Sequence, residues 1–590
     1  MPEPVARVKS IFSSSKALLL LVAVYVAVNA RWIWLYRQNN LLDIDEAGYL
    51  SMAFSYYRSL SGSGLGDWFK SVLSPGIQAP ITPALASLLF WISTPSILTG
   101  FAVPLLAGVI CVLSTYWLAR CLMSAPAALW AAALVASCPL LTIFARSFHF
   151  SIPATALFTL SLVCMLRSRN FASLLWASLF GICVGLLPLT RTMTIAFLPG
   201  LFVGAAVHTV AQLRALWQRL GVLLWSTFLA IIVSGSWLVG SSSLVFGYLF
   251  NFGYGKQASE YGAKYSLLEL SAWRHMVVMN LDYLSLPHAL VLLAGILASL
   301  LLALRTVKRH GASVALNQWS HSPAFPLTMV LLCCVAALSS SQNSGSAFVA
   351  PVIPLSIVLS VWAINSSLFS GLSRKIAASL GGLVCLTASI PLADASWSTS
   401  RPWRVKIPIL QAEVNITDGR GTAFVGLGDG RGQEYPVGGS FYGANTSSSN
   451  SLSPEKRQAW IALADAASHA VKAESAASKG GVAFGFRHFL LNPNTVRLSS
   501  LIHGSDLPPL YMVAPVQIGD SLSAYQIWLT KGDASAASLL FTLSGEQGEY
   551  MPKVSKELIA QAAQIAGFEP TQSWLAPTGQ QLQLWKRLSK

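Results

Sequence analysis

The chain has 590 residues, of which 54% are hydrophobic and only 11% are charged, whereas soluble domains carry about 25% charged residues. The formal net charge is +16, but residues 393–590 hold 17 Lys or Arg against 15 Asp or Glu, so the excess lies in residues 1–392. Because this excess sits among apolar runs, it indicates membrane topology and argues against a nucleic-acid-binding protein.

The sequence divides near residue 392 into an apolar part and a polar part. All eight cysteines lie in the apolar part without metal-ligand spacing, so no disulfide framework is indicated. We predict a polytopic α-helical transmembrane domain over residues 1–392 and a soluble α/β domain, outside the cytoplasm, over residues 393–590.

Long apolar stretches predict the membrane spans. A membrane helix needs about 20 apolar residues, and about eleven stretches approach this length. With the N-terminus in the cytoplasm, every segment on that side carries Arg or Lys, as the positive-inside rule requires. An odd number of spans then leaves the C-terminal domain outside. The predicted spans are 17–37, 97–119, 125–145, 150–166, 171–188, 192–212, 220–240, 286–304, 324–342, 349–369 and 374–392.

A shorter apolar run over residues 81–94 follows Pro80. Counting it as a span would reverse the side of the later basic segments, so we predict a re-entrant or interfacial helix on the outer face. Apart from Glu3, the acidic residues of the membrane domain all lie in two predicted outer loops, residues 38–96 and 241–285. This distribution favours one polar site at the outer membrane face.

The first outer loop carries Asp43, Asp45 and Glu46 directly after the first span. Such close carboxylates repel one another, so their pKa values should be raised unless cations or a divalent metal compensate. A raised pKa suits a general base. The alternative is a helix N-terminus, with Asp43 or Asp45 as the cap of a helix that runs to about Leu60.

Basic residues outside the cytoplasmic segments are candidates for binding a phosphate, although contact with lipid headgroups is the favoured explanation for most of them. Two of them lie at membrane boundaries, where a charge is costly without a partner. His149 is a candidate ligand or proton carrier, or simply an interfacial hydrogen-bonding group. The basic candidates are Arg58, Lys70, Lys256 and, at the boundaries, Arg146 and Arg191.

Over about residues 17–392 the sequence resembles the GT-C membrane glycosyltransferases, specifically the family-39-like enzymes that include protein O-mannosyltransferases and the lipid A aminoarabinose transferase. Asp45-Glu46 followed by Tyr49 resembles the family's Asp-Glu signature after the first helix. Further similarities follow in the expected order: Gly66-Asp67-Trp68, Pro80 to Pro83, Leu189-Thr190-Arg191, and Pro351 with Pro354.

The resemblance implies transfer of a sugar from a polyprenyl-phosphate donor to an acceptor hydroxyl at the outer face, with inversion. Asp45 would then be the base and Glu46 would orient the acceptor or the site. Cations such as Arg191 and Arg58 would stabilise the departing phosphate, and Tyr49, Asp67 and the other basic candidates would contact substrate. Two alternatives remain: a transporter or flippase of lipid-linked sugars, and a non-catalytic cell-envelope assembly protein.

Apolar runs alternate with helical patterns in the C-terminal part, which predicts the α/β domain. We expect this domain to recognise the acceptor or to cover the site. The predicted helices are 453–478 and 554–566, and the predicted strands are Thr422–Leu427, Val482–Phe486, Leu510–Val516, Ser538–Leu543 and a final edge strand over Gln580–Arg587.

Overall fold

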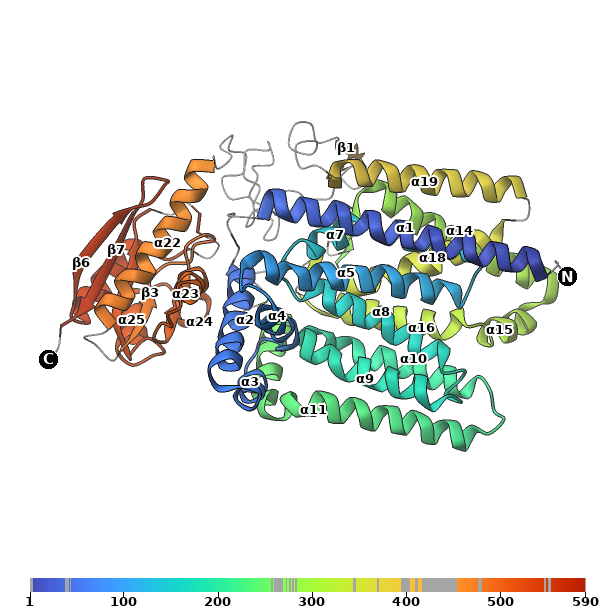
Figure 1. Ribbon diagram of the computed structural model, residues 1–590, viewed down its shortest axis with the longest axis horizontal. Coiled ribbons are helices and arrows are strands. Elements are labelled where there is room, and N and C mark those ends of the chain that lie inside the picture. Colours follow the sequence, from blue (N-terminus) through green and yellow to red (C-terminus); the bar gives the residue numbers. More distant parts are fainter. Residues whose placement is uncertain are drawn as a thin grey trace.

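The computed structural model shows a helical bundle with a smaller sheet domain at one end (Figure 1). The described residues are 4–37, 42, 44–255, 258, 269–271, 273–274, 277, 281, 284–342, 346–368, 371–393, 404–408, 412–415, 454–475, 480–545, 548–549 and 553–588. The predicted strand Thr422–Leu427 lies outside these residues.

The bundle consists of long apolar helices that lie side by side (Figure 1). Among the described residues, six helices are long and apolar enough to span a membrane, or up to eight if each of two bent pairs is one span. The polytopic helical fold is confirmed, and the count of about eleven spans stays a prediction. The bundle helices are α1 Pro4–Arg37, α5 Ile97–Arg120, α8 Ser151–Arg167, α9 Leu174–Thr190, α10 Leu198–Val210, α11 Leu216–Tyr254, α14 Leu286–His310, α16 Ala324–Ser340, α18 Ile353–Ser367 and α19 Gly371–Ala393.

The predicted span over residues 125–145 is broken in the middle. It forms α6 (Ala125–Ala136) and α7 (Pro139–Ala145), which are bent by 64° relative to each other. Pro139 has no backbone N–H and disfavours the helical conformation at the preceding residue, so Cys138 is extended with φ −72° and ψ 119°. The second bent pair joins α15 (Ala312–Ser320) to α16 at 85°.

Helix α11 continues to Tyr254, although the predicted span ended at residue 240. It lies close against α9 because Gly181 and Gly185 have no side chains at the contact. A Cβ at Gly181 would lie 2.2 Å from the backbone oxygen of Ser226, and one at Gly185 would lie 2.7 Å from that of Ala230. Small residues four apart allow such close approach between membrane helices.

This contact gives a prediction for stability. The Gly181→Ala variant should be destabilised by about 1–3 kcal/mol, because its new methyl group meets backbone and not a movable side chain. Gly221→Ala, on α11, is the control, since a Cβ there would meet nothing within 4 Å. Thermal unfolding of the detergent-solubilised variants checks this; equal melting temperatures would contradict the close packing.

Three helices lie at the end of the bundle nearest the sheet domain (Figure 1). They are α2 (Ile44–Ser63), α3 (Leu65–Val72) and α4 (Ile81–Ile92). Helix α2 runs across the bundle direction. The helix predicted over residues 81–94 is present as α4, whose Phe90 packs on Phe54 of α2 with ring centroids 4.8 Å apart.

The C-terminal domain is an α/β domain, as predicted. Its five-stranded sheet has the order β4-β3-β5-β7-β6, with β3 parallel to β4 and β5, and β7 antiparallel to β5 and β6. A separate antiparallel pair, β1 and β2, lies earlier in the chain. The bounds are β1 Arg404–Ile407, β2 Ala412–Asn415, α22 Pro454–Ser475, β3 Gly481–Phe484, α23 Pro493–Ile502, β4 Leu510–Met512, α24 Pro515–Ile518, α25 Leu522–Thr530, β5 Ala537–Leu543, α26 Lys556–Ile565, β6 Phe568–Leu575 and β7 Gln581–Arg587.

Alternate residues of the central strands bury opposite faces of this sheet. Val482 of β3 packs in the cluster that includes α22 and α23, whereas the adjacent Ala483 packs in the cluster that includes α25 and α26. The prediction of an edge strand at Gln580–Arg587 is wrong, because β7 lies between β5 and β6. The edge is β6, and its Pro570 lies at a register shift, where a missing N–H is tolerated.

Helix α23 attaches the C-terminal domain to α2. The helix begins with a capping box in which Asn492 and Thr495 satisfy each other's backbone N–H groups. Its Leu498 and Leu501 are buried in the same apolar cluster as α2. Arg58 of α2 donates from Nη2 to the backbone oxygen of Leu501 at 3.0 Å. The two domains therefore meet at the outer helices.

Candidate functional site

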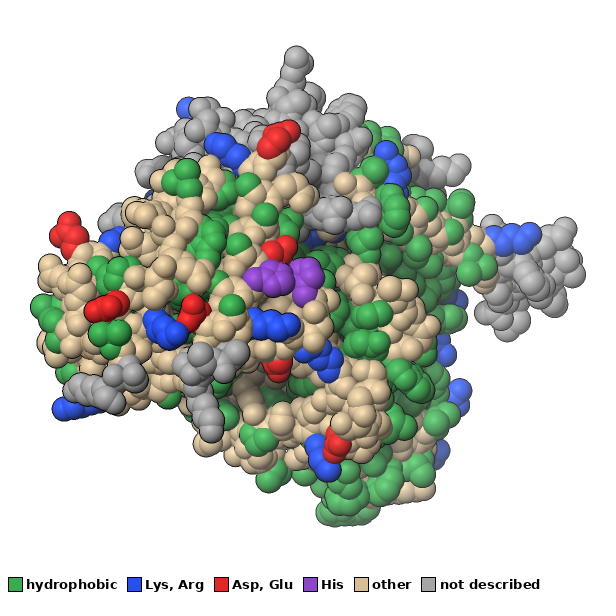
Figure 2. Space-filling model, turned by 60° about the vertical axis from the view of Figure 1, so that its left-hand side comes forward, with side chains coloured by type: hydrophobic (Ala, Val, Ile, Leu, Met, Phe, Trp, Pro, Cys, Tyr) green, Lys and Arg blue, Asp and Glu red, His purple; other side chains and the backbone are tan. Residues whose placement is uncertain are grey.

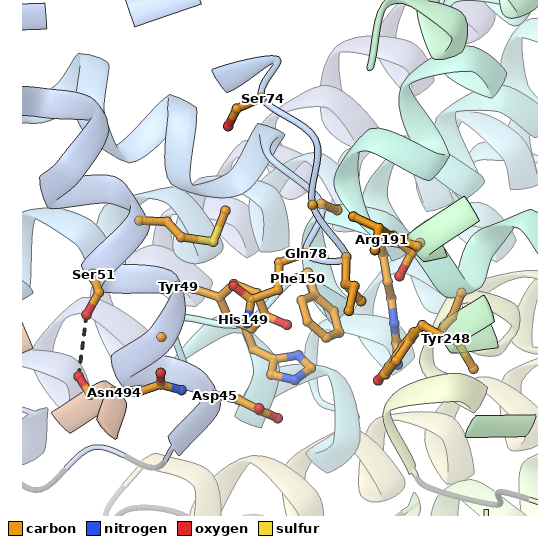
Figure 3. A pocket seen from close by; sticks show the side chains of 18 of the residues that line it. Asp45, Tyr49, Ser51, Ser74, Gln78, His149, Phe150, Arg191, Tyr248 and Asn494 are labelled. Carbon is orange, nitrogen blue, oxygen red and sulfur yellow. Dashed lines mark hydrogen bonds between the residues drawn. The ribbon is translucent and has the colours of Figure 1, made fainter. Parts of the chain in front are cut away.

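A cavity of about 760 Å³ lies between the outer helices, the end of the bundle and the C-terminal domain. Figure 2 shows polar side chains over the C-terminal domain, hydrophobic side chains over the bundle, and a hollow where the two parts meet. Figure 3 shows Asp45 and Asn494 on one side of the cavity and Arg191 with Tyr248 on the other. Segments distant in sequence therefore contribute to one site.

Asp45 lies in the first turn of α2 and lines the cavity. The predicted helix after the first span is thus present, but it begins at Ile44, so Asp45 lies inside its first turn and is not its cap. The other cap candidate, Asp43, lies outside the described residues. Desolvation in the cavity raises the pKa of Asp45 to about 6, and the negative charge of Glu46 acts in the same direction. The positive charge of Arg191 opposes this shift.

Glu46 is fully buried and forms an ion pair outside the cavity lining. Arg37, at the end of α1, donates from Nη2 to both carboxylate oxygens of Glu46 at 2.5 Å. The backbone N–H of Phe148 donates to the same carboxylate at 3.1 Å. Glu46 therefore connects α1, α2 and the turn before α8, which suits a positioning residue.

Arg37 was not among the predicted site residues. It is a charged residue at the end of an apolar span, the same signal that singled out Arg146 and Arg191. Its guanidinium lies 4.7 Å from the ring centroid of Phe101, so the pair with Glu46 is enclosed by apolar surface. Applying the boundary rule to every span would have found it.

His149 lies in the turn between α7 and α8 and lines the cavity. Its Nδ1 accepts a hydrogen bond from the backbone N–H of Ser151 at 3.2 Å, and the Ser151 hydroxyl lies 2.8 Å from the same nitrogen. Burial and the nearby charge of Arg191 hold the pKa of His149 well below its usual value. The imidazole is therefore neutral, with its hydrogen on Nε2.

Arg191 lies where α9 ends and the 3-10 helix η1 (Thr192–Phe197) begins. Its guanidinium carbon lies 4.8 Å from the ring centroids of both Phe150 and Phe348. Nη1 donates to the Ser151 hydroxyl at 3.1 Å and to the backbone oxygen of Ala347. Within the described part of the chain, its buried Nε has no hydrogen-bond partner. This fixed cation is suited to an anionic ligand.

A smaller apolar cavity of about 40 Å³ adjoins Arg191. It shares Arg191, Met193 and Phe348 with the main cavity and continues along Phe197 of η1 and Leu338 of α16. If an anion bound to Arg191 had an apolar chain, this smaller apolar cavity is where the start of the chain would lie.

The structure does not bring all predicted residues to the cavity. Arg146 is buried and donates from Nε to Asn29 at 2.6 Å, with its guanidinium over the ring of Trp32. Arg58 binds the backbone of α23, as described above. Neither residue lines the cavity. Among the sequence candidates, Asp45, Tyr49, His149 and Arg191 are the cavity residues.

Two further candidates form a surface pair away from the cavity. Lys70 donates to Asp67 at 2.8 Å on α3, and both side chains are exposed. Lys256 and Asp43 lie outside the described residues. No group of three or more His, Cys, Asp or Glu side chains that could hold a metal ion occurs in the described part of the chain.

Several lining residues were missed by the sequence analysis. Tyr248 reaches the cavity because α11 is longer than predicted. Asn494 and Arg497 come from α23 in the C-terminal domain. The sequence carried no signal that pairs α23 with α2, since the two helices are far apart in the chain.

The bundle, the outer helices and the C-terminal sheet domain together have the fold of the GT-C membrane glycosyltransferases. The structure is similar to that of ArnT from Cupriavidus metallidurans in the apo state, with a TM-score of 0.55 and 16% identity over 97% of this chain and 98% of that chain. It is also similar to ArnT from the same organism bound to undecaprenyl phosphate, with a TM-score of 0.56 and 14% identity over 96% and 97% of the two chains.

An archaeal oligosaccharyltransferase, AglB from Archaeoglobus fulgidus in complex with an inhibitory peptide and a dolichol-phosphate, gives a TM-score of 0.47 and 13% identity. That comparison covers 96% of this chain and 74% of the other. No protein-family model and no curated protein matches the sequence.

Proposed function

We propose that this protein transfers a sugar from a polyprenyl-phosphate donor to an acceptor hydroxyl at the outer face of the membrane, with inversion. The observation that carries the proposal is the arrangement of one cavity. Asp45 lies on one side, and Arg191 lies on the other, next to the smaller apolar cavity. A general base and a site for a lipid phosphate are the two parts that this reaction needs.

The donor is assigned to the Arg191 side. The guanidinium is fixed between two aromatic rings and lines the cavity, so a permanent positive charge faces the place proposed for the phosphate. The smaller apolar cavity beside Arg191 would receive the first part of the isoprenoid chain. ArnT, which has the same fold, has been solved with undecaprenyl phosphate bound, which supports this class of donor.

The reaction then follows from the two sides of the cavity. The Asp45 carboxylate removes the proton from the acceptor hydroxyl, whose oxygen forms a bond to the anomeric carbon of the sugar. The bond from that carbon to the phosphate oxygen breaks, and the electron pair leaves with the polyprenyl phosphate. Arg191 stabilises the negative charge on the departing phosphate. Attack opposite the leaving group inverts the anomeric configuration.

Other residues of the site position these groups. The Arg37–Glu46 ion pair and its bond to the Phe148 backbone hold the first turn of α2 against the turn that carries His149. His149 lines the same cavity, and its Nδ1 bond to the Ser151 backbone fixes the imidazole ring there.

The raised pKa of Asp45 predicts a pH dependence. Asp45 accepts a proton only as a carboxylate, so kcat/KM should be constant above pH 7 and fall about tenfold per pH unit below pH 6. For an unperturbed aspartate the fall would begin near pH 4. Initial rates of sugar transfer between pH 4.5 and 8 check this. A profile that stays flat down to pH 5 would contradict the assignment of Asp45 as the base.

We also propose that the N-terminus is cytoplasmic and that the C-terminal domain lies outside. Helices α5, α8 and α14 carry basic residues in their last turns, Arg120, Arg167 and Lys308. This arrangement supports a cytoplasmic location for those ends.

The function is tested by incubating the purified protein with radiolabelled polyprenyl-phosphate sugars and a membrane extract. We expect label to move from the lipid to an acceptor, with release of free polyprenyl phosphate. If reconstituted protein moved the intact lipid-linked sugar across the bilayer without transferring it, the flippase alternative would replace this proposal.

A further inference from the structure

The C-terminal domain contributes a cation to the cavity through α23. Asn494, Arg497, Leu498 and Leu501 share one face of this helix, because residues three and four apart lie on the same side. The two leucines pack in the cluster of α2, while Asn494 and Arg497 line the cavity. The apolar contact therefore fixes where the polar pair lies.

Asn494 places this face beside the first turn of α2. Its Nδ2 donates to the backbone oxygen of Ile44, the residue before Asp45, at 2.8 Å. A Cβ at Gly48 would lie only 2.8 Å from the same nitrogen, so a larger residue at position 48 would displace the Asn494 side chain. Figure 3 shows Asn494 on the side of the cavity that holds Asp45, opposite Arg191.

The charge of the lining indicates two anionic groups. Among the described residues that line the cavity, Asp45 is the acidic residue and Arg191 and Arg497 are the permanently charged bases. The buried Nε of Arg497 has no hydrogen-bond partner among the described residues. One lipid phosphate at Arg191 would leave the positive charge of Arg497, which also lines the cavity, for a second anionic group.

We infer that Arg497 and Asn494 bind an anionic group, a phosphate or a carboxylate, of the acceptor. This inference rests on the proposed function and adds the chemical class of the second substrate. The acceptor hydroxyl must reach Asp45 to lose its proton, and α23 contacts the turn carrying Asp45 from the side of the C-terminal domain. Arg497 is thus a residue for acceptor specificity, supplied by the C-terminal domain.

Steady-state kinetics with a membrane extract as the source of acceptor test this assignment. The Arg497→Gln variant should raise the apparent KM for the acceptor about tenfold or more, with the KM for the polyprenyl-phosphate sugar unchanged. Arg497→Lys, which keeps the charge, should retain most of the acceptor affinity. Lys531→Gln, which removes an exposed cation of the same domain, is the control. An increase in the donor KM instead would assign Arg497 to the donor and overturn the inference.

A binding measurement separates failure of this inference from failure of the proposed function. Protein saturated with polyprenyl phosphate, which occupies Arg191, is titrated with inorganic phosphate. Wild type should bind phosphate at least fivefold more tightly than Arg497→Gln at equal melting temperature. Equal affinities would overturn the inference even if sugar transfer is observed. Weaker binding by the variant, without any sugar transfer by wild type, would support the anion site and refute the proposed function.

Discussion

The Asp45→Asn variant is expected to lose sugar transfer by a factor of about 10³ or more, while it still binds polyprenyl phosphate. Removing a positioned general base costs about 10² to 10⁴ in rate, and no other described carboxylate lines the cavity to replace it. The amide has nearly the same shape as the carboxylate, so the fold should be retained. Transfer of label and binding of polyprenyl phosphate are measured on the same preparation.

Asp67→Asn is the matched control for this prediction. Asp67 belongs to the same outer region of the sequence, but it pairs with Lys70 on the surface of α3, away from the cavity. An exposed pair of this kind contributes little to stability, so this variant should transfer sugar at the wild-type rate. Equal loss in both variants would point to a general effect of the outer region and would contradict the role of Asp45.

The second large effect is expected for Arg191. Arg191→Gln should weaken binding of polyprenyl phosphate and lower kcat about 10² to 10³-fold, because the cation acts most strongly on the charge that develops on the leaving phosphate. Arg191→Lys should recover only a small part of this loss. A lysine ammonium lacks the planar guanidinium that lies between Phe150 and Phe348 and also bonds Ser151.

Lys70→Gln serves as the control for Arg191, since it removes an exposed cation outside the cavity. Fluorescence or calorimetric titration with polyprenyl phosphate reports binding, and single-turnover transfer reports chemistry. If Arg191→Gln bound and transferred like wild type, the donor would have to lie elsewhere in the protein.

The sequence was sufficient for features that depend on local pattern. Apolar length and the basic residues predicted the helical membrane domain, and alternation predicted the α/β domain. The position of Arg191 at a membrane boundary, where a charge is costly without a partner, predicted it as a site residue. Asp45 was predicted from the cluster of carboxylates in the first outer loop and from the family resemblance. The structure places both in the lining of the cavity.

The remaining features depend on contacts between distant segments. Arg146 was predicted by the same criterion as Arg191, a charge at a membrane boundary. In the structure, however, the guanidinium of Arg146 binds Asn29 and lies over the ring of Trp32, both on α1 inside the bundle. Sequence alone gives no means of separating these two arginines. Arg497 lies in a soluble domain where an arginine is unremarkable, and only the packing of α23 on α2 turns it toward the cavity.

Glu46 shows how neighbouring residues can take different roles. Successive side chains of a helix point in directions about 100° apart. Asp45 therefore faces the cavity while Glu46 is buried against Arg37. The buried charge of Glu46 helps to raise the pKa of Asp45, so in the proposed mechanism Asp45 is the base and Glu46 is a supporting residue.

The most direct test of the central claim is an experimental structure of Asp45→Asn bound to a polyprenyl-phosphate sugar, which this variant should not consume. The account predicts that the phosphate contacts Arg191, that the isoprenoid chain enters the smaller apolar cavity along Phe197, and that the anomeric carbon of the sugar faces position 45. A phosphate bound away from Arg191, or a sugar on the side of the phosphate remote from position 45, would contradict it.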